Sequence, residues 1–79
     1  MRSKMPKTVI TFAATSDAMA MEVAAREHGI PGRVIPVPSE IDAGCGMAWC
    51  AAGDERDELI ALMEQFGLPY EGVFEVSLY

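Results

Sequence analysis

The chain has 79 residues, 51% hydrophobic and 23% charged, which predicts one small folded domain with a modest core. Twelve acidic residues against six lysines and arginines give a net charge of −6, which argues against binding nucleic acid or an anionic membrane surface. No stretch approaches the roughly 18 apolar residues of a membrane span, and the N-terminus lacks a signal-peptide pattern. We therefore expect a cytoplasmic protein with a tail over residues 1–6 and an ordered core over residues 7–79.

The first half of the chain predicts a strand, a helix and an extended segment. Residues 8–14 are β-branched and aromatic, as in a strand. Ser16 is a suitable N-cap for a helix over residues 17–28, and Gly29 is its stop signal. Residues 32–38 are then extended.

The second half predicts the same elements again after a loop over residues 39–44. Residues 45–51 form a third strand, and Asp54 is the expected N-cap of a second helix that ends before Gly67. Apolar and polar residues alternate over residues 72–79, which indicates a half-buried strand.

The order β-α-β-β-α-β predicts an α+β, ferredoxin-like sandwich: a four-stranded antiparallel sheet of order 4-1-3-2 with both helices on one face. A short internal repeat supports it, because Gly29-Ile30-Pro31 and Gly67-Leu68-Pro69 each end a helix and lead into a strand. Pro36 and Pro38 lack amide hydrogens on one side of the second strand, so this strand should be an edge.

Cys45 is the most conspicuous candidate for chemistry, because its neighbours Gly44 and Gly46 leave it little shielding. The second thiol, Cys50, would lie about 16 Å away along an extended strand, beyond the roughly 7 Å that a disulfide allows. Two thiols and the lone His28 are too few for a structural zinc site, so we expect no metal and no cofactor.

The predicted topology places Cys45 at the same end of the molecule as the start of the first helix. Free amides at a helix N-terminus favour an anion, and thus the nucleophilic form of a thiol. The hydroxyl groups of Thr15 and Ser16 would lie close enough to donate hydrogen bonds to that anion. Cys45 is the predicted reactive residue, with Gly44, Gly46, Thr15 and Ser16 as its support.

Several short motifs spread over the chain form a recognisable pattern: Thr11-Phe12, Asp17-Ala18-Met19, Glu22, Gly29-Ile30-Pro31, residues 33–38 (RVIPVP), residues 43–48 (AGCGMA) and Gly72-Val73-Phe74. From about Lys7 to Val76, this pattern resembles the selenium/sulfur (Se/S) carrier-like family, long catalogued as a domain of unknown function. Its most specific part is the Ile-Pro-Val-Pro stretch followed by a Cys-Gly step.

The resemblance implies a small carrier that accepts sulfur or selenium on Cys45, as a persulfide or selenosulfide, and hands it to a partner. It also implies donor and acceptor proteins, for example a cysteine desulfurase, and a stoichiometric role rather than that of a turnover enzyme. Two positions depart from the family pattern. Ser39 stands where arginine is frequent, and Asp42 where serine is frequent, and both changes disfavour a thiolate.

Three other interpretations remain open. The chain could be a non-enzymatic interaction or regulatory module that acts through its open sheet face or as a homodimer. Cys45 and Cys50 could form a redox couple if a bulge or turn brings them together. Cys45 could also be only a small residue at the start of a strand. The exposure of Cys45, and its position relative to the first helix, discriminate best among these.

Overall fold

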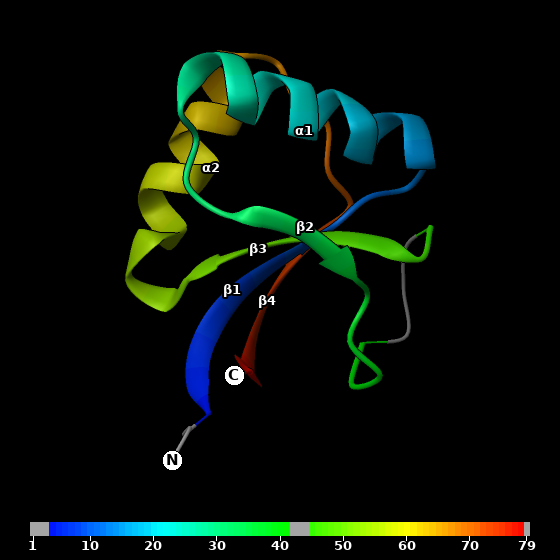
Figure 1. The fold of residues 1–79 in the computed structure, drawn as a ribbon, viewed down its shortest axis with the longest axis vertical. Coiled ribbons are helices and arrows are strands. Elements are labelled where there is room, and N and C mark those ends of the chain that lie inside the picture. The colour runs from blue at the N-terminus through cyan, green and yellow to red at the C-terminus, as the bar shows by residue number, and fades with distance from the viewer. Residues whose placement is uncertain (1–3, 42–44, 79) are drawn as a thin grey trace.

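The structure is a computed structural model that describes residues 4–41 and 45–78 of the chain. Its elements follow the predicted order (Figure 1). They are β1 (Met5–Thr11), α1 (Thr15–His28), β2 (Arg33–Pro36), β3 (Met47–Ala52), the 3₁₀ turn η1 (Gly53–Glu55), α2 (Arg56–Gln65) and β4 (Gly72–Leu78).

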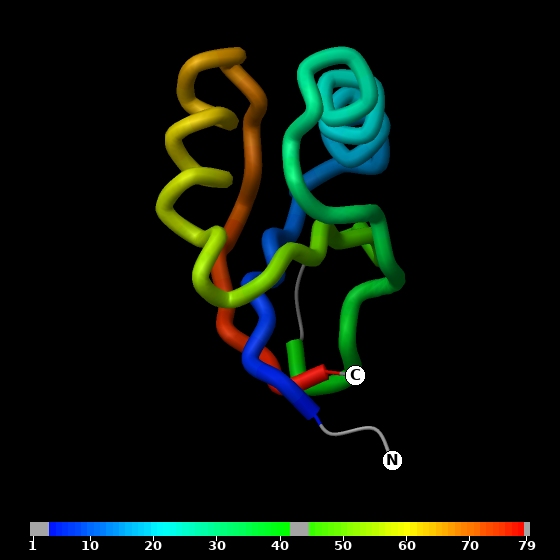
Figure 2. The backbone as a smooth tube through the Cα atoms, turned by 60° about the vertical axis from the view of Figure 1, so that its left-hand side comes forward, coloured from blue at the N-terminus to red at the C-terminus, as the bar shows by residue number. Residues whose placement is uncertain are grey.

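The four strands form one antiparallel sheet of order β2-β3-β1-β4, which is the predicted order 4-1-3-2 read from the other edge. Both helices lie on the same side of this sheet (Figures 1 and 2). In the centre of the sheet, Ile10 on β1 lies between Trp49 on β3 and Val73 on β4. The ferredoxin-like α+β fold is therefore confirmed.

The second strand is an edge of the sheet, as its prolines predicted. Pro36 pairs with Met47 without offering an amide hydrogen, and the next residue, Val37, donates its amide to the Gly46 carbonyl at 3.0 Å. The amides that face β3 are thus intact, while Pro36 and Pro38 occupy the positions that face outward. The opposite edge, β4, contains no proline.

The core has two parts, one on each face of the sheet. The larger part fills the space between the sheet and the helices, and it is built from Ile10, Phe12, Ala18, Met21, Ala25, Ile30, Trp49, Ala51, Leu59 and Met63. On the other face, Ile41 packs with Val9, Ala48 and Val76. The loop that follows β2 therefore covers part of the face opposite the helices.

The internal repeat marks the ends of both helices. Gly29 and Gly67 adopt left-handed conformations with φ of 67° and 65°, which glycine accepts without strain. In both cases the amide after the glycine donates to a carbonyl five residues earlier, at 3.1 Å and 2.8 Å. His28 at the end of α1 stacks on Phe66 after α2, with ring centroids 4.1 Å apart. The stacked rings tie the two helix ends together.

Several predicted boundaries near the candidate site were wrong. β1 covers Met5–Thr11 rather than 8–14, so Met5 and Pro6 belong to the strand and not to a tail. The N-cap of α1 is Ala14, whose carbonyl accepts the amides of Asp17 and Ala18 at 3.0 and 3.4 Å. Ser16 lies inside the first turn instead. Alanine has no side-chain acceptor, so this helix begins without a side-chain cap.

The third strand and the second helix also begin later than predicted. β3 starts at Met47, so Cys45 precedes the strand. The carboxylate of Glu55 accepts the Ala52 amide at 3.0 Å, which stabilises the 3₁₀ turn η1 and delays α2 to Arg56. Asp54 is therefore part of that turn and not an N-cap. β4 reaches Leu78, and the predicted end at Tyr79 lies outside the described residues.

Candidate functional site

Cys45 is held by its backbone at the end of the central strand β1. Its amide donates to the carbonyl of Phe12 at 3.0 Å, and the following residue, Gly46, adopts a φ of +96° that turns the chain into β3. The Cys45 Sγ lies 3.9 Å from the Met47 carbonyl oxygen, a long contact. The side chain is half-buried and packs against the helix-side core. The backbone is thus anchored while the thiol keeps some access to solvent.

Phe12, like Met47, is a residue of this arrangement that the sequence did not assign to the site. It contributes through its carbonyl oxygen, and its buried side chain belongs to the core. A backbone carbonyl leaves no signature in residue type. The only available signal was that Thr11-Phe12 forms part of the motif pattern.

The structure describes part of the segment before Cys45. Gly44, a predicted supporting residue, and Asp42 lie outside the described residues. Ser39 is exposed, and its hydroxyl donates to the neighbouring Glu40 carboxylate at 3.3 Å. Among the described residues, no hydrogen bond joins Ser39 to Cys45.

Thr15 and Ser16 form the first turn of α1 and are both exposed. Within residues 4–41 and 45–78, neither hydroxyl bonds to Cys45, so the predicted direct hydrogen bonds are not made in this conformation. Their backbone amides have no partner in the same part of the chain, as expected for a helix N-terminus. The chain runs from Phe12, which holds Cys45, through Ala14 into this turn.

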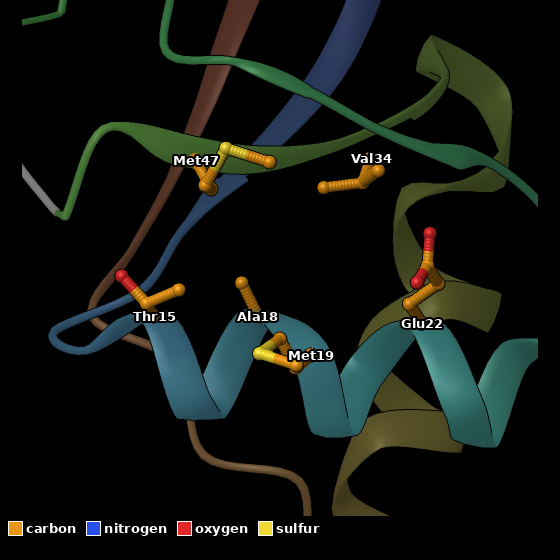
Figure 3. Close-up of a pocket in the computed structure, with 6 residues that line it drawn as sticks. All are labelled: Thr15, Ala18, Met19, Glu22, Val34 and Met47. Carbon is orange, nitrogen blue, oxygen red and sulfur yellow. The ribbon is translucent and has the colours of Figure 1, made fainter.

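A small cavity opens beside this end of the molecule, between α1 and the strands β2 and β3 (Figure 3). Its volume is about 70 Å³. Figure 3 shows Met47 and Val34 on the strand side facing α1 across the gap. The lining residues are Thr15, Ala18, Met19, Glu22, Val34 and Met47. The cavity adjoins Cys45 through Met47, whose carbonyl contacts the thiol.

Cys50 occupies a different environment. It lies within β3 between Trp49 and Ala51, which face the helix-side core, so its own side chain faces the opposite side of the sheet. Only 8% of Cys50 is exposed. Both cysteines are free thiols, and they face opposite sides of the sheet, because Cys45 packs against the helix-side core.

The other conspicuous side chains serve packing, with one exception. Trp49 is buried, and its Nε1 donates to the Pro31 carbonyl at 2.9 Å. Met21 and Met63 are buried in the core, whereas Met19 is 62% exposed. The described residues contain no group of three or more potential metal ligands. Neither helix described here is long and apolar enough to cross a membrane.

A family model described as "Putative Se/S carrier protein-like" matches residues 7–75, more than four-fifths of the chain. The chain belongs to this Se/S carrier-like family. The match runs from β1 into β4 and so includes Cys45, the start of α1 and every residue that lines the small cavity. No curated protein and no solved structure matches this Se/S carrier-like chain.

Proposed function

We propose that this protein is a small carrier that accepts sulfur or selenium on Cys45 and hands it to a partner protein. The observation that carries the proposal is the setting of Cys45. It is the more accessible of the two thiols, and its backbone is fixed next to the turn that leads into α1. An anchored backbone with a reachable sulfur suits a residue that must meet a second protein.

The transfer is an exchange at sulfur with no net change in oxidation state. The Cys45 thiolate attacks the terminal sulfur of a donor persulfide, R–S–SH. A sulfur–sulfur bond forms at Cys45 while the donor bond breaks, leaving Cys45 as a persulfide and the donor as a thiolate, R–S⁻. A selenosulfide donor, R–S–SeH, reacts at selenium in the same way. An acceptor nucleophile then attacks the terminal atom, and the Cys45 thiolate leaves.

The N-terminus of α1 supports this chemistry electrostatically. The unpaired amides of Thr15 and Ser16 and the positive end of the helix dipole favour a nearby anion by about 0.3–1 kcal/mol at an exposed site. Asp17 is the one acidic residue in the first turn of α1. Its carboxylate is itself stabilised by the helix dipole, which reduces the stabilisation of a second anion at the same place.

We propose a protein donor, such as a cysteine desulfurase, and a second protein as acceptor, with transfer in the cytoplasm. Two free thiols suit a reducing compartment. A domain of 79 residues with small surface cavities suits a carrier that presents its cargo rather than one that encloses a substrate.

The direct test is mass spectrometry of the intact protein after incubation with a cysteine desulfurase and cysteine. We expect the added mass of one sulfur atom, lost on reduction and mapped by peptide analysis to Cys45, with Cys50 as an internal control. Absence of added sulfur, in a sample whose Cys45 reacts readily with an alkylating reagent, would contradict the proposal.

A second candidate function, an interaction module, is favoured by one observation on the other face of the sheet. Phe74 on β4 is 38% exposed there, next to the cluster that includes Val76. We expect sedimentation analysis to show a dimer that Phe74→Ser dissolves if this face mediates self-association. A monomer at all concentrations would leave the face without that role.

A further inference from the structure

A second hollow continues the small cavity along α1. It has a volume of about 280 Å³ and also lies between α1 and the strands. Glu22 lines both hollows, so they are adjacent, and the two together are called the seam groove here (Figure 3 shows the first hollow). The second hollow is lined by Glu22, Ala25, Arg26, Ile30, Gly32, Arg33 and Trp49.

The end of the seam groove nearest Cys45 is apolar. Ala18 and Met19 form its helix side, and Val34 and Met47 form its strand side. Met19 is 62% exposed, although a methionine is normally buried. Flexible methionine side chains adapt to the shape of a partner, so this end suits an incoming apolar side chain.

The far end of the seam groove is cationic in an acidic protein. Arg26 on α1 and Arg33 on β2 line the same hollow, although the whole chain has only six lysines and arginines against twelve acids. Glu22 lies 3.6 Å from Arg26 and offsets part of its charge. Arg33 makes no ion pair within the described residues. This end therefore offers a guanidinium group to a carboxylate.

We propose that the seam groove docks an extended segment of the partner protein that carries an apolar side chain and, about three residues away, a carboxylate. The spacing follows from geometry. Met19 and Arg26 are separated by about 10 Å along the helix at about 1.5 Å per residue, which an extended peptide covers in about three residues. The inference rests on the proposed function, since it describes how a donor or acceptor aligns with Cys45.

The neighbouring edge of the sheet explains why side chains carry this recognition. An extended segment commonly binds by adding a strand to an open sheet edge. Here Pro36 and Pro38 remove outward amides from the edge that borders the groove. The segment therefore lies over α1 and β2, held by Met19 at one end and by Arg26 and Arg33 at the other.

The test is an amide-resolved NMR titration of the reduced protein with a synthetic peptide, acetyl-Gly-Leu-Ser-Ser-Asp-Gly-amide. We expect shifts confined to α1, β2 and the start of β3, with a Kd on the order of 1 mM, as suits a short flexible probe. Replacing the peptide's leucine by glycine, or its aspartate by lysine, should weaken binding by about tenfold each.

Matched variants of the protein assign the effect to the groove. Arg33→Glu should weaken binding by about tenfold, whereas Arg56→Glu, an exposed arginine on α2, should not change it. Met19→Lys should weaken binding, whereas Met5→Lys, at a methionine of similar exposure, should not. Equal effects of Arg33→Glu and Arg56→Glu, or shifts scattered over the whole chain, would overturn the proposal.

The docking proposal and the carrier proposal fail separately. Cys45→Ser should leave peptide binding unchanged while it abolishes sulfur uptake. Arg33→Glu should reduce sulfur uptake from a desulfurase but not from a small uncharged organic persulfide. A peptide that causes no shifts in a protein that still accepts sulfur on Cys45 would overturn the docking proposal alone.

Discussion

Cys45 and Cys50 are five residues apart in the chain, yet the fold gives them opposite settings. Cys50 lies inside β3 with 8% of its surface exposed, whereas Cys45 precedes the strand, half-buried, with its amide bonded to Phe12. The difference comes from the backbone. A continuous ladder encloses Cys50, while the positive φ of Gly46 takes Cys45 out of the ladder. The Cys45 thiol is available because the regular pairing of β3 begins only at Met47, two residues further along the chain.

The largest expected difference between the two thiols is in sulfur uptake. Cys45→Ser should abolish the added sulfur on incubation with a desulfurase, because it removes the attacking atom. Cys50→Ala should retain uptake at close to the wild-type level. Intact mass spectrometry of both variants provides the measurement, with circular dichroism as the check on folding. Uptake that survives Cys45→Ser and disappears in Cys50→Ala would reverse the assignment.

Alkylation of the native protein should separate the thiols by rate. We expect Cys45 to react with iodoacetamide at least about a hundredfold faster than Cys50, because Cys50 requires a local opening that costs about 3 kcal/mol or more. Peptide mapping at successive times gives both rates from one sample. In denaturant the two alkylation rates should converge. Similar rates for Cys45 and Cys50 in the native state would contradict the expected difference in accessibility.

The glycines beside the two thiols should differ in their tolerance of a methyl group. A Cβ at Gly32 would lie 2.6 Å from the Cys50 carbonyl oxygen and would collide with Trp49, in addition to the strain of its φ of +113°. Gly32→Ala should therefore cost about 2–4 kcal/mol.

Gly46→Ala provides the matched comparison for Gly32→Ala. It meets nothing within 4 Å and carries only the strain of a φ of +96°, for a cost of about 1 kcal/mol. Urea unfolding followed by Trp49 fluorescence measures both variants. Equal costs would show that crowding around Cys50 is not the larger constraint.

The smallest expected effect concerns the start of α1 beside Cys45. Ala14→Ser should stabilise the protein by about 1 kcal/mol, because Ala14 has the extended conformation of an N-cap without an acceptor side chain. Ser16→Ala should change stability by less than about 0.5 kcal/mol, since Ser16 lies inside the turn and is exposed. Thermal unfolding gives both values. A larger loss for Ser16→Ala would restore Ser16 as the cap.

Much of the fold was predictable because its signals are local and strong. The glycines that end both helices need no tertiary information, since a left-handed turn after a helix strongly favours glycine. Pro36 and Pro38 identified β2 as an edge for a reason that holds in any sheet. The strand order followed from the order of the elements, because two consecutive β-α-β halves tend to pack together as one sandwich.

The predicted boundaries failed where tertiary contacts override local preference. Ser16 is the better N-cap by residue type, but β1 ends at Thr11 and the helix starts as soon as the chain has turned over the sheet. Cys45 reads as strand from its apolar neighbours. Its amide instead bonds to a carbonyl beyond the end of β1, a contact that no residue pattern reports.

The candidate site was predicted as a location rather than as a set of contacts. The topology correctly brought Cys45 to the end of the molecule where α1 begins, but the expected bonds from Thr15 and Ser16 are not made. The alanines and methionines of α1 give it no clear apolar stripe, so the residue pattern does not say whether Met19 is buried. Its exposure, and with it the seam groove, required the three-dimensional structure.

The unequal edges of the sheet set a direction for assembly. Growth by strand addition is closed at β2, where the prolines lie, and open at β4, where seven residues form an edge without proline. A second chain that extends the sheet would therefore join at the side remote from the seam groove. A dimer joined at the β4 edge would therefore leave the seam groove and Cys45 of both protomers open to partner proteins.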